Sequence, residues 1–398
     1  MSVDHVPTLD ETRAAARSWL AANWVPGADE QQFLEAAVDA GWAFPTLAEE
    51  LGGRALTDEH ADVVADEFDS IGAPMGAGRI PVQGLAVRLI STYRPTESLR
   101  HVMRRFLLGR ERLCLLYSEP GAGSDLAAVQ TRADRDGDEW VVNGQKVWTS
   151  VASDATLGLL VCRTDWDVPK HKGITIFLLP MDQTGIDVRP IKQITGRATF
   201  NEIFITDARV HDDYRIGELN RGWNVLQTAL ALERMSMGTG STHDRPKGTE
   251  LVRSPAASLV SLAVSTGRNQ EGWLRQSIAR LYALERIGQW NGARAEGGAD
   301  PAVGSIVKLA MSEILHGTAR LDTSILGGAG LLNEADTDAE HAHLAGFCAF
   351  ENSIGGGSDQ IQRNLIGERI LGLPREPAVD RDVAFRDVPK AAATRSFG

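Results

Sequence analysis

The spacing of apolar residues changes twice along this chain. From residue 9 to about residue 112, apolar residues recur at intervals of three and four, which is typical of amphipathic helices. From residue 113 to about residue 205, short runs rich in β-branched residues alternate with turn residues, which predicts an antiparallel sheet. The helical spacing returns after residue 222 and continues to about residue 371. We therefore predict an α+β chain in which a β domain separates two helical segments.

These changes divide the chain into four segments. Residues 1–112 are predicted to form an N-terminal α-helical domain, 113–220 a central antiparallel β domain, and 221–373 a C-terminal helical domain. Residues 374–398 are polar and aperiodic, so we expect an extended or mobile arm. Connections between C-terminal helices are expected at 238–254 and 294–304.

The composition is that of a soluble globular chain with more than one domain. The 398 residues carry a net charge of −12, which argues against nucleic acids and anionic membranes as main partners. Three cysteines are too few for a disulfide framework. The first residues lack signal-peptide features, and no apolar run is long enough to span a membrane. We therefore expect a cytoplasmic protein. The sequence also lacks a P-loop and a zinc-spaced Cys/His cluster, so no metal site is expected.

Two neighbouring blocks combine glycines, small hydroxyls and a tryptophan. The first reads YSEPGAGSD at 117–125 and follows an apolar run, and the second reads NGQKVWTS at 143–150. Glycines let a backbone approach a ligand closely, hydroxyls offer hydrogen bonds, and an indole offers a flat wall for an aromatic ring. Either block alone also fits an ordinary turn or, at Asn143-Gly144, an ordinary hairpin. Together they predict a cradle for a cofactor.

A glutamate lies on the apolar face of the helix predicted after residue 222. Leu226, Ala229, Leu230 and Glu233 follow one another at i, i+3, i+4 and i+7. Burial of a carboxylic acid disfavours its charged form, which suits a general base that works near neutral pH. The alternative is structural, namely an ion pair between Glu233 and an arginine of a neighbouring helix.

Both blocks resemble the flavin site of the acyl-CoA dehydrogenase family, whose order of helical, β and helical domains is also similar. A third segment, IGGGSDQIQRN at 354–364, resembles the family's C-terminal signature, in which an acidic residue precedes Gly-Thr and an Ile-Gln-Arg triplet follows. The resemblance extends from about residue 9 to residue 374. It implies FAD as the cofactor, an acyl-CoA substrate, and a C-terminal four-helix bundle that shares the flavin with the β domain.

The resemblance also implies roles for individual residues. Expected to bind the flavin ring or its chain are Tyr117, Ser118, Gly123, Ser124, Trp148, Ser150, Ser358 and Gln360. Expected to bind the substrate are Ser124 at the CoA end, Arg234 on the acyl-CoA side, and a backbone N–H of Gly356 or Gly357 at the thioester carbonyl. The alternative for Arg234 is a structural ion pair. Asp125 is expected to cap the following turn.

The position of the general base departs from that of most family members. Many carry a glutamate in the C-terminal signature, at a position that the Ile-Gln-Arg triplet aligns with Gly356, and glycine cannot accept a proton. Isovaleryl- and long-chain-type members instead carry a Glu-Arg pair on the helix that begins the C-terminal domain. This chain has Glu233 and Arg234 there. The resemblance and the helical spacing therefore both indicate Glu233 as the catalytic base.

In most members the neighbouring subunit supplies part of each flavin site, and here that part is weakened. The family's Arg-x-x-Phe-Gly segment corresponds to 266–273, where Arg268 is a loose match and the Phe-Gly pair is missing. Ser324 replaces the family's glutamine before Leu-Gly-Gly. Either other groups bind the adenosine end of FAD, or a second related chain supplies the intact half. Paired actinobacterial chains associated with steroid side-chain shortening, which 240–254 resembles, work in the second way.

We therefore expect a flavin-dependent acyl-CoA dehydrogenase of fatty acid or steroid degradation that forms a 2,3-enoyl thioester. Glu233 would remove the α-proton, and flavin N5 would accept the β-hydride. By resemblance the chain would be a dimer or tetramer, alone or with a second related chain, and an electron-transfer flavoprotein would accept the electrons. The alternatives are an oxidase or dehydrogenase that acts on a carrier-protein thioester, and a non-catalytic supporting subunit. Gly238 and Gly240 would leave room for a bulky acyl group.

Overall fold

The computed structural model describes residues 6–76, 81–93, 95–238, 255–296, 302–332, 337–378 and 380–389. Two compact units divide the chain. Unit 1 contains Met1–Ile191, Ala198–Ala229 and Val379–Gly398, and unit 2 contains Lys192–Arg197 and Leu230–Ala378. The side chains of 234–238, and with them the predicted site residue Arg234 and Gly238, lie outside the described residues, as does the loop 239–254 with Gly240.

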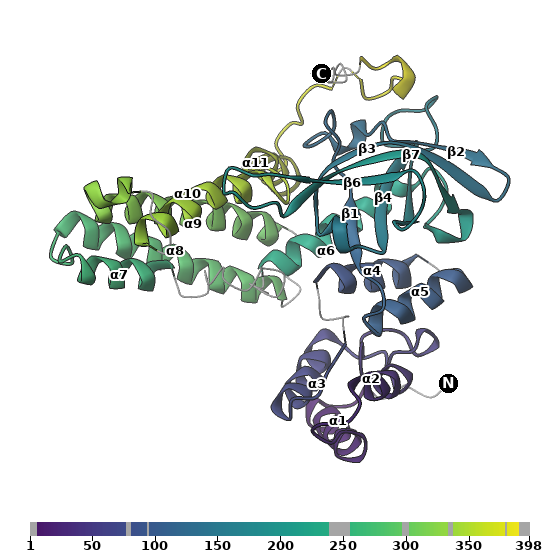
Figure 1. Cartoon of the computed structure of the whole chain (residues 1–398), viewed down its shortest axis with the longest axis horizontal. Helices are drawn as coiled ribbons and strands as arrows, with labels where there is room; N and C mark the ends of the chain where they lie inside the picture. Colours follow the sequence, from purple (N-terminus) through teal and green to yellow (C-terminus); the bar gives the residue numbers. More distant parts are fainter. Residues whose placement is uncertain are drawn as a thin grey trace. The chain divides into compact units, whose positions relative to one another are not determined.

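The N-terminal part of unit 1 is helical, as predicted. Its described helices are α1 (Leu9–Asn23), α2 (Glu30–Asp39), α3 (Asp58–Ser70), α4 (Pro81–Thr92) and α5 (Glu97–Leu107), shown in purple and blue in Figure 1. A capping box begins α1, where the Thr8 side chain accepts from the Glu11 N–H and the Glu11 carboxylate accepts from the Thr8 N–H. The rings of Trp19, Phe33 and Phe68 pack together between α1, α2 and α3.

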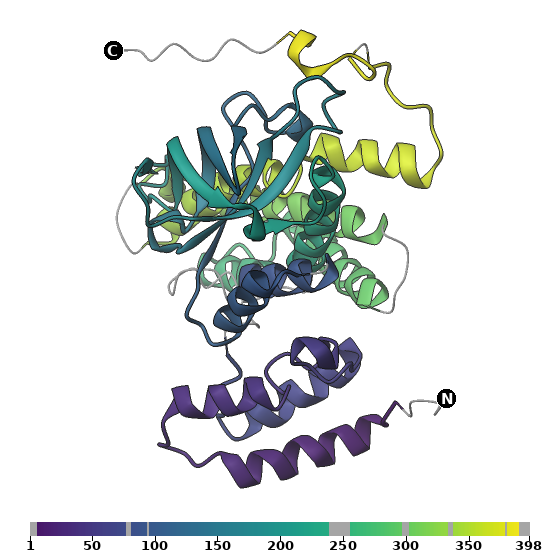
Figure 2. The same cartoon turned by 90° about the vertical axis from the view of Figure 1, so that its right-hand side faces the viewer.

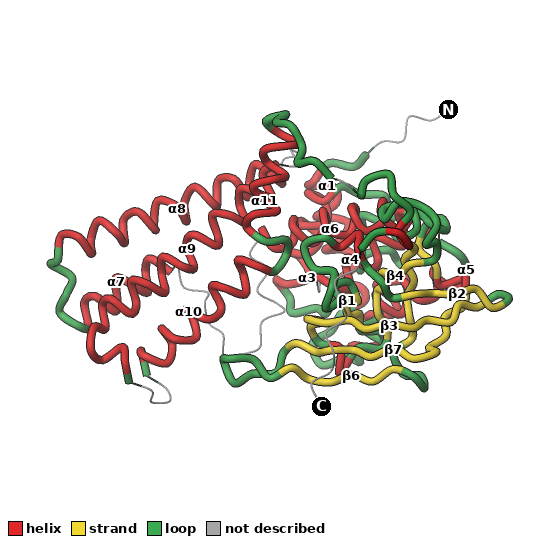
Figure 3. Tube along the Cα trace, turned by 90° about the horizontal axis from the view of Figure 1, so that it is seen from above, coloured by secondary structure: helices red, strands yellow, loops and turns green. Residues whose placement is uncertain are grey.

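A single mostly antiparallel sheet follows, which confirms the predicted β domain (Figure 3). The strand order is β6-β7-β3-β2-β4-β5-β8, and β1 pairs in parallel with β4. An apolar cluster that includes Trp140, Val142, Phe177 and Ile203 forms the core of the sheet. The strands are β1 (Leu113–Leu116), β2 (Arg132–Asp136), β3 (Glu139–Ser150), β4 (Leu157–Arg163), β5 (Ile174–Pro180), β6 (Ile186–Ile191), β7 (Phe200–His211) and β8 (Arg215–Ile216).

The possible hairpin at Asn143-Gly144 is wrong, because β3 runs through these residues from Glu139 to Ser150. The glycine is required by close packing rather than by a turn. A Cβ on Gly144 would lie 2.4 Å from Thr131 Oγ1 and 2.7 Å from Thr131 Cα. The tight connection instead lies between β2 and β3 at Gly137, whose φ is +67°.

Unit 2 contains a bundle of antiparallel helices, as predicted. Helices α7 (Pro255–Ser265), α8 (Gly272–Glu296), α9 (Ala302–Leu326) and α10 (Asp338–Ile354) pack side by side (Figure 1). Helix α6 (Gly222–Gly238) passes from unit 1 into unit 2, and the short helix α11 (Asp359–Leu365) packs on α9. Helix α8 continues to Glu296, so the predicted connection from residue 294 starts later. None of the described helices is long and apolar enough to cross a membrane.

The C-terminal arm at 374–398 was expected to be extended or mobile, and mobility is wrong for residues 380–389. This segment contacts the turn between β4 and β5, where Pro169 forms a β-bridge with Ala384 (Figure 2). Phe385 anchors it and is fully buried. Sequence periodicity missed the contact because one aromatic residue in an irregular segment carries it.

Candidate functional site

The two glycine- and serine-containing blocks lie side by side in unit 1. The first block follows β1, and the second is the end of β3. They are joined where the Val147 N–H donates to Ser118 O at 2.9 Å. Ser118 is half-buried, whereas Gly123, Ser124 and Ser150 are exposed. The structure therefore brings together the part of the predicted cradle that belongs to unit 1.

Trp148 lies at an irregularity in β3. The pairing of β3 with β7 shifts register between Lys146 and Thr149, as in a β-bulge. Trp148 has a φ of +62°, which is unfavourable for a side chain of this size, and its side chain remains 60% exposed. Its ring makes an edge contact with Phe200 at 6.1 Å. An exposed aromatic ring on a strained backbone is a recurrent feature of ligand sites.

A buried ion pair, which was not predicted from the sequence, fixes both blocks. Lys146 Nζ lies 2.8 Å from Glu119 Oε1 and also donates to Tyr117 O at 3.0 Å and Val161 O at 2.7 Å. Both side chains are almost inaccessible to solvent. Burial alone would raise the pKa of Glu119, but the charge and hydrogen bond of Lys146 outweigh it, so the pKa is lowered. The sequence did contain a signal for this pair, namely one oppositely charged residue in each block, Glu119 and Lys146.

The Glu119 carboxylate also holds the segment that follows the first block. It accepts the backbone N–H groups of Gln130 at 2.6 Å and Thr131 at 2.9 Å. One carboxylate thus connects residue 119 to the segment just before β2. Asp125, by contrast, does not cap the following turn with its side chain, which corrects the prediction. Its carboxylate instead pairs with Lys170 at 2.8 Å.

The predicted base lies on α6, whose expected apolar face is buried at two of its four positions. Leu226 and Ala229 are buried, whereas Leu230 and Glu233 are half-buried. The half-buried position of Glu233 is compatible with a base or with a structural ion pair. Its catalytic role stays a prediction.

The glycine-rich segment before α11 has a backbone that few other residues could adopt. Gly356 has a φ of +63° and Gly357 a φ of +85°. The Gln362 side chain, which is fully buried, donates to Gly356 O at 2.9 Å, and a Cβ on Gly357 would lie 2.7 Å from its amide nitrogen. Ser358 caps α11 by accepting the Ile361 N–H. The hydroxyl of Ser358 therefore has a structural task besides its predicted role.

The first residue of α11 fastens this segment to α9. Asp359 Oδ1 accepts from Lys308 Nζ at 2.7 Å and from Ser312 Oγ at 2.8 Å. Lys308 and Ser312 were not predicted, because they lie about 50 residues from the signature along the chain. Gln362 lies within the signature, but nothing in the sequence shows that its side chain turns back to Gly356. Gln360, which was predicted, is exposed.

The two segments predicted to contact a neighbouring subunit's flavin meet in unit 2. Arg268 donates to the backbone oxygens of Ser324 and, at 3.1 Å, of Ile325. Its guanidinium also binds the Glu271 carboxylate through two contacts of 2.5 and 2.8 Å. Glu271 occupies the phenylalanine position of the family segment. The positive charge at this surface is therefore compensated within the chain.

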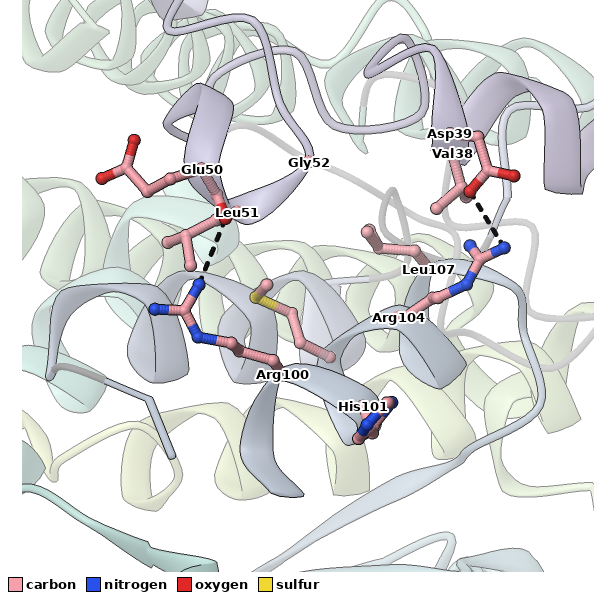
Figure 4. Close-up of a pocket in the computed structure, with 10 residues that line it drawn as sticks. Val38, Asp39, Glu50, Leu51, Gly52, Arg100, His101, Arg104 and Leu107 are labelled. Atoms are coloured by element: carbon pink, nitrogen blue, oxygen red, sulfur yellow. Dashed lines mark hydrogen bonds and ion pairs between the residues drawn. The ribbon is translucent and has the colours of Figure 1, made fainter. Parts of the chain in front are cut away.

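A cavity of about 290 Å³ lies elsewhere, between α2, α5 and the turn at Glu50 (Figure 4). Arg104 pairs with Asp39 at 2.9 Å, and Arg100 donates to Glu50 O at 3.1 Å. None of its lining residues is a predicted site residue. Its arginines are already paired, so nothing marks it as a binding site.

Comparison with known proteins agrees with this arrangement. Residues 114–208 match the family model described as acyl-CoA dehydrogenase, middle domain, and residues 220–371 match acyl-CoA dehydrogenase, C-terminal domain. The chain is 34% identical to the acyl-CoA dehydrogenase IpdE1 of Mycobacterium tuberculosis, over 92% of this chain and 98% of the relative.

Two solved structures that the chain resembles are paired assemblies by name. One is the Tcur3481-Tcur3483 steroid ACAD, with 27% identity, a TM-score of 0.68, and coverage of 94% of this chain and 100% of that chain. The other is the ChsE4-ChsE5 complex from Mycobacterium tuberculosis, with 27% identity, a TM-score of 0.62 and the same coverage.

Proposed function

Because this chain belongs to the acyl-CoA dehydrogenase family, we propose that it catalyses FAD-dependent 2,3-dehydrogenation of an acyl-CoA, with Glu233 as the base. Membership of this family implies the general reaction, which is the flavin-dependent dehydrogenation of an acyl-CoA. The observation that supports the flavin site is the exposed, strained Trp148, which lies next to the Ser118 segment. An indole held in this way would stabilise the binding of a flat ligand more than it would stabilise the sheet. The assignment of Glu233 as the base rests on the family resemblance and on its position on α6.

The residues around Trp148 fit a flavin. The exposed indole offers a wall for a ring system, and the hydroxyls of Ser118, Ser124 and Ser150 can donate or accept hydrogen bonds. Gly123 is exposed, and a Cβ there would meet nothing within 4 Å, so its backbone is open to a ligand. We assign FAD binding to these residues together with Tyr117, Ser358 and Gln360.

Bound FAD supplies the two-electron acceptor for the hydride that leaves the substrate's β-carbon. The Glu233 carboxylate takes the proton from the α-carbon, and the remaining electron pair forms the 2,3 double bond. The backbone N–H of Gly356 or Gly357 donates to the thioester carbonyl and stabilises negative charge on its oxygen. Arg234 binds on the acyl-CoA side. An electron-transfer flavoprotein would accept the electrons from the cofactor, as the family resemblance implies.

Glu233→Gln tests the assignment of the base. The variant removes the proton acceptor but keeps the shape of the side chain. We expect it to retain the flavin absorbance spectrum and to lose bleaching by acyl-CoA under anaerobic conditions. Full turnover by Glu233→Gln would eliminate Glu233 as the base. Rapid reaction of the reduced flavin with oxygen would instead favour the oxidase alternative.

We also propose a bulky acyl group and a second related chain as partner. The relatives named as steroid enzymes and paired complexes support both parts. Neutralisation of Arg268 by Glu271 supports the second related chain as partner. The pyrophosphate of a flavin bound by a neighbouring copy of this chain would meet the Glu271 carboxylate beside Arg268. Exposed apolar residues on α8 and α10 would form the interface: Trp273, Tyr282, Ile287, Trp290, Phe347 and Phe350.

Counting FAD per chain separates the two oligomeric arrangements. The chain purified alone is expected to hold substantially less than one FAD, and co-expression with a related chain from the same organism is expected to raise this to one FAD per copy of the present chain. One tightly held FAD per chain in a homo-oligomer would rule out an obligate partner. It would leave the dehydrogenase assignment intact.

A further inference from the structure

The C-terminal segment 380–389, which we call the C-terminal strap, makes a specific contact with unit 1. The ring of Phe385 lies 5.4 Å from the ring of Trp166, in the turn between β4 and β5. The Phe385 N–H donates to Val168 O at 2.9 Å, and the Arg386 N–H donates to Trp166 O at 2.9 Å. A fully buried ring together with paired backbone groups indicates a defined docking site for the strap.

Arg163 connects the strap to the segment that follows the first block. Its side chain is fully buried, and its Cζ lies 3.6 Å from the centroid of the Phe385 ring. Its nitrogens donate to Ala127 O at 2.6 Å, Val129 O at 3.1 Å and Lys170 O at 3.0 Å. Phe385 therefore covers the arginine that holds the backbone just after residue 125. Without the ring, water would compete for these hydrogen bonds.

Lys170 makes a second, independent link. Its Nζ lies 2.8 Å from Asp125 on the first block and 2.8 Å from Asp380 on the strap. Partial burial alone would lower the pKa of Lys170, but hydrogen bonds to both carboxylates outweigh it, so the pKa is raised and the cation persists. The strap and the block also share the wall of a cavity of about 220 Å³, to which Gly121 and Asp380 contribute.

We propose that the C-terminal strap holds residues 117–131 in their ligand-binding conformation, with Phe385, Asp380 and Lys170 as positioning residues. Lys146 and Glu119 fix the start of this segment from inside the sheet, as described above. The strap fixes its middle and end from outside, through Asp125 and through Ala127 and Val129. The consequence for FAD retention rests on the proposed function, whereas the effect on the mobility of 117–131 does not.

Hydrogen exchange followed by mass spectrometry tests the proposal on the full chain. We expect Phe385→Ala to speed amide exchange in 117–131 by about tenfold or more, and Asp380→Asn by a smaller factor, while α8 and α9 exchange at the wild-type rate. A chain that ends at Ala378 should behave like Phe385→Ala. The matched control is Arg386→Ala, on the same strap, whose ion pair with Asp167 is exposed. It should leave exchange in 117–131 unchanged.

The outcomes separate this inference from the proposed function. The proposal that the strap holds residues 117–131 would be overturned if this segment exchanged at the wild-type rate in both Asp380→Asn and the shortened chain. Equal acceleration in α8 and α9 would also overturn the proposal, since it would mean global destabilisation. Faster exchange in 117–131 together with faster FAD loss supports both proposals. Faster exchange with unchanged FAD retention supports the strap and contradicts the assignment of FAD to this segment.

Discussion

The Lys146–Glu119 pair of unit 1 and the Arg268–Glu271 pair of unit 2 lie beside predicted flavin-binding segments, but their surroundings differ. The side chains of Lys146 and Glu119 are 0% and 6% exposed, and each makes further hydrogen bonds to backbone groups. The side chains of Arg268 and Glu271 are 30% and 36% exposed and lie three residues apart on one segment. The first pair joins segments at 117–119, 130–131, 146 and 161. The second pair is local, and only Arg268 reaches further, to backbone oxygens at 324 and 325.

This difference separates two uses of an ion pair. A buried pair costs desolvation and contributes little net stability, but the removal of one partner leaves an uncompensated charge inside the protein. Lys146 and Glu119 therefore fix the shape of the cradle. An exposed local pair is screened by water and holds little in place. Arg268 and Glu271 change the charge that a neighbouring chain would meet.

The largest expected effect comes from Lys146→Met. It keeps most of the side-chain volume but leaves the Glu119 carboxylate buried without its cation. We expect the free energy of unfolding to fall by about 3–5 kcal/mol, measured by urea denaturation, and FAD to be lost. In the matched double variant, Lys146→Met with Glu119→Gln, part of the stability should return. A single variant as stable as the wild type would contradict the role of the pair.

The same pair predicts how stability depends on acid pH. The folded-state pKa of Glu119 is lowered below its unfolded value, so the stabilisation is present above the unfolded pKa and is lost as the pH falls through the folded pKa. Between neutral pH and pH 3, the melting temperature of Glu119→Gln should therefore fall less steeply than that of the wild type. Identical slopes would show that other carboxylates control acid unfolding.

An intermediate effect is expected at Trp148. Trp148→Asn suits the left-handed backbone, because asparagine tolerates a positive φ better than most residues, but it removes the flat ring. We expect the dissociation constant of FAD to rise about tenfold, measured by titration of the apoprotein, with little change in melting temperature. Trp148→Phe keeps a flat ring and should bind FAD more tightly than the asparagine variant. FAD affinity that is equal in all three proteins would contradict the assignment.

Sequence alone predicted the three structural regimes, the two blocks and the helix that carries Glu233, because each depends on local periodicity or turn chemistry. It failed where a contact joins residues far apart in the chain. Two such contacts are the pair of Lys146 with Glu119 and the pair of Phe385 with Arg163. The residues next to each of them in the sequence do not indicate which distant residue it contacts. A hairpin at Asn143-Gly144 stayed open as an alternative, because Thr131, whose close contact requires this glycine, lies on another segment.

The smallest expected effect comes from Glu271→Gln, which releases Arg268 from its carboxylate. Because the pair is local and solvent-exposed, we expect the melting temperature to change by no more than about 2 °C. The number of FAD molecules bound per chain should not fall, in contrast to Lys146→Met. Arg268→Gln is the comparison variant. It removes the hydrogen bonds to Ser324 O and Ile325 O as well as the ion pair, so its melting temperature should fall further than that of Glu271→Gln. A large loss of stability or of FAD in Glu271→Gln would mean that this pair, like the buried one, maintains the shape of a binding site. The pair would then do more than neutralise a surface charge.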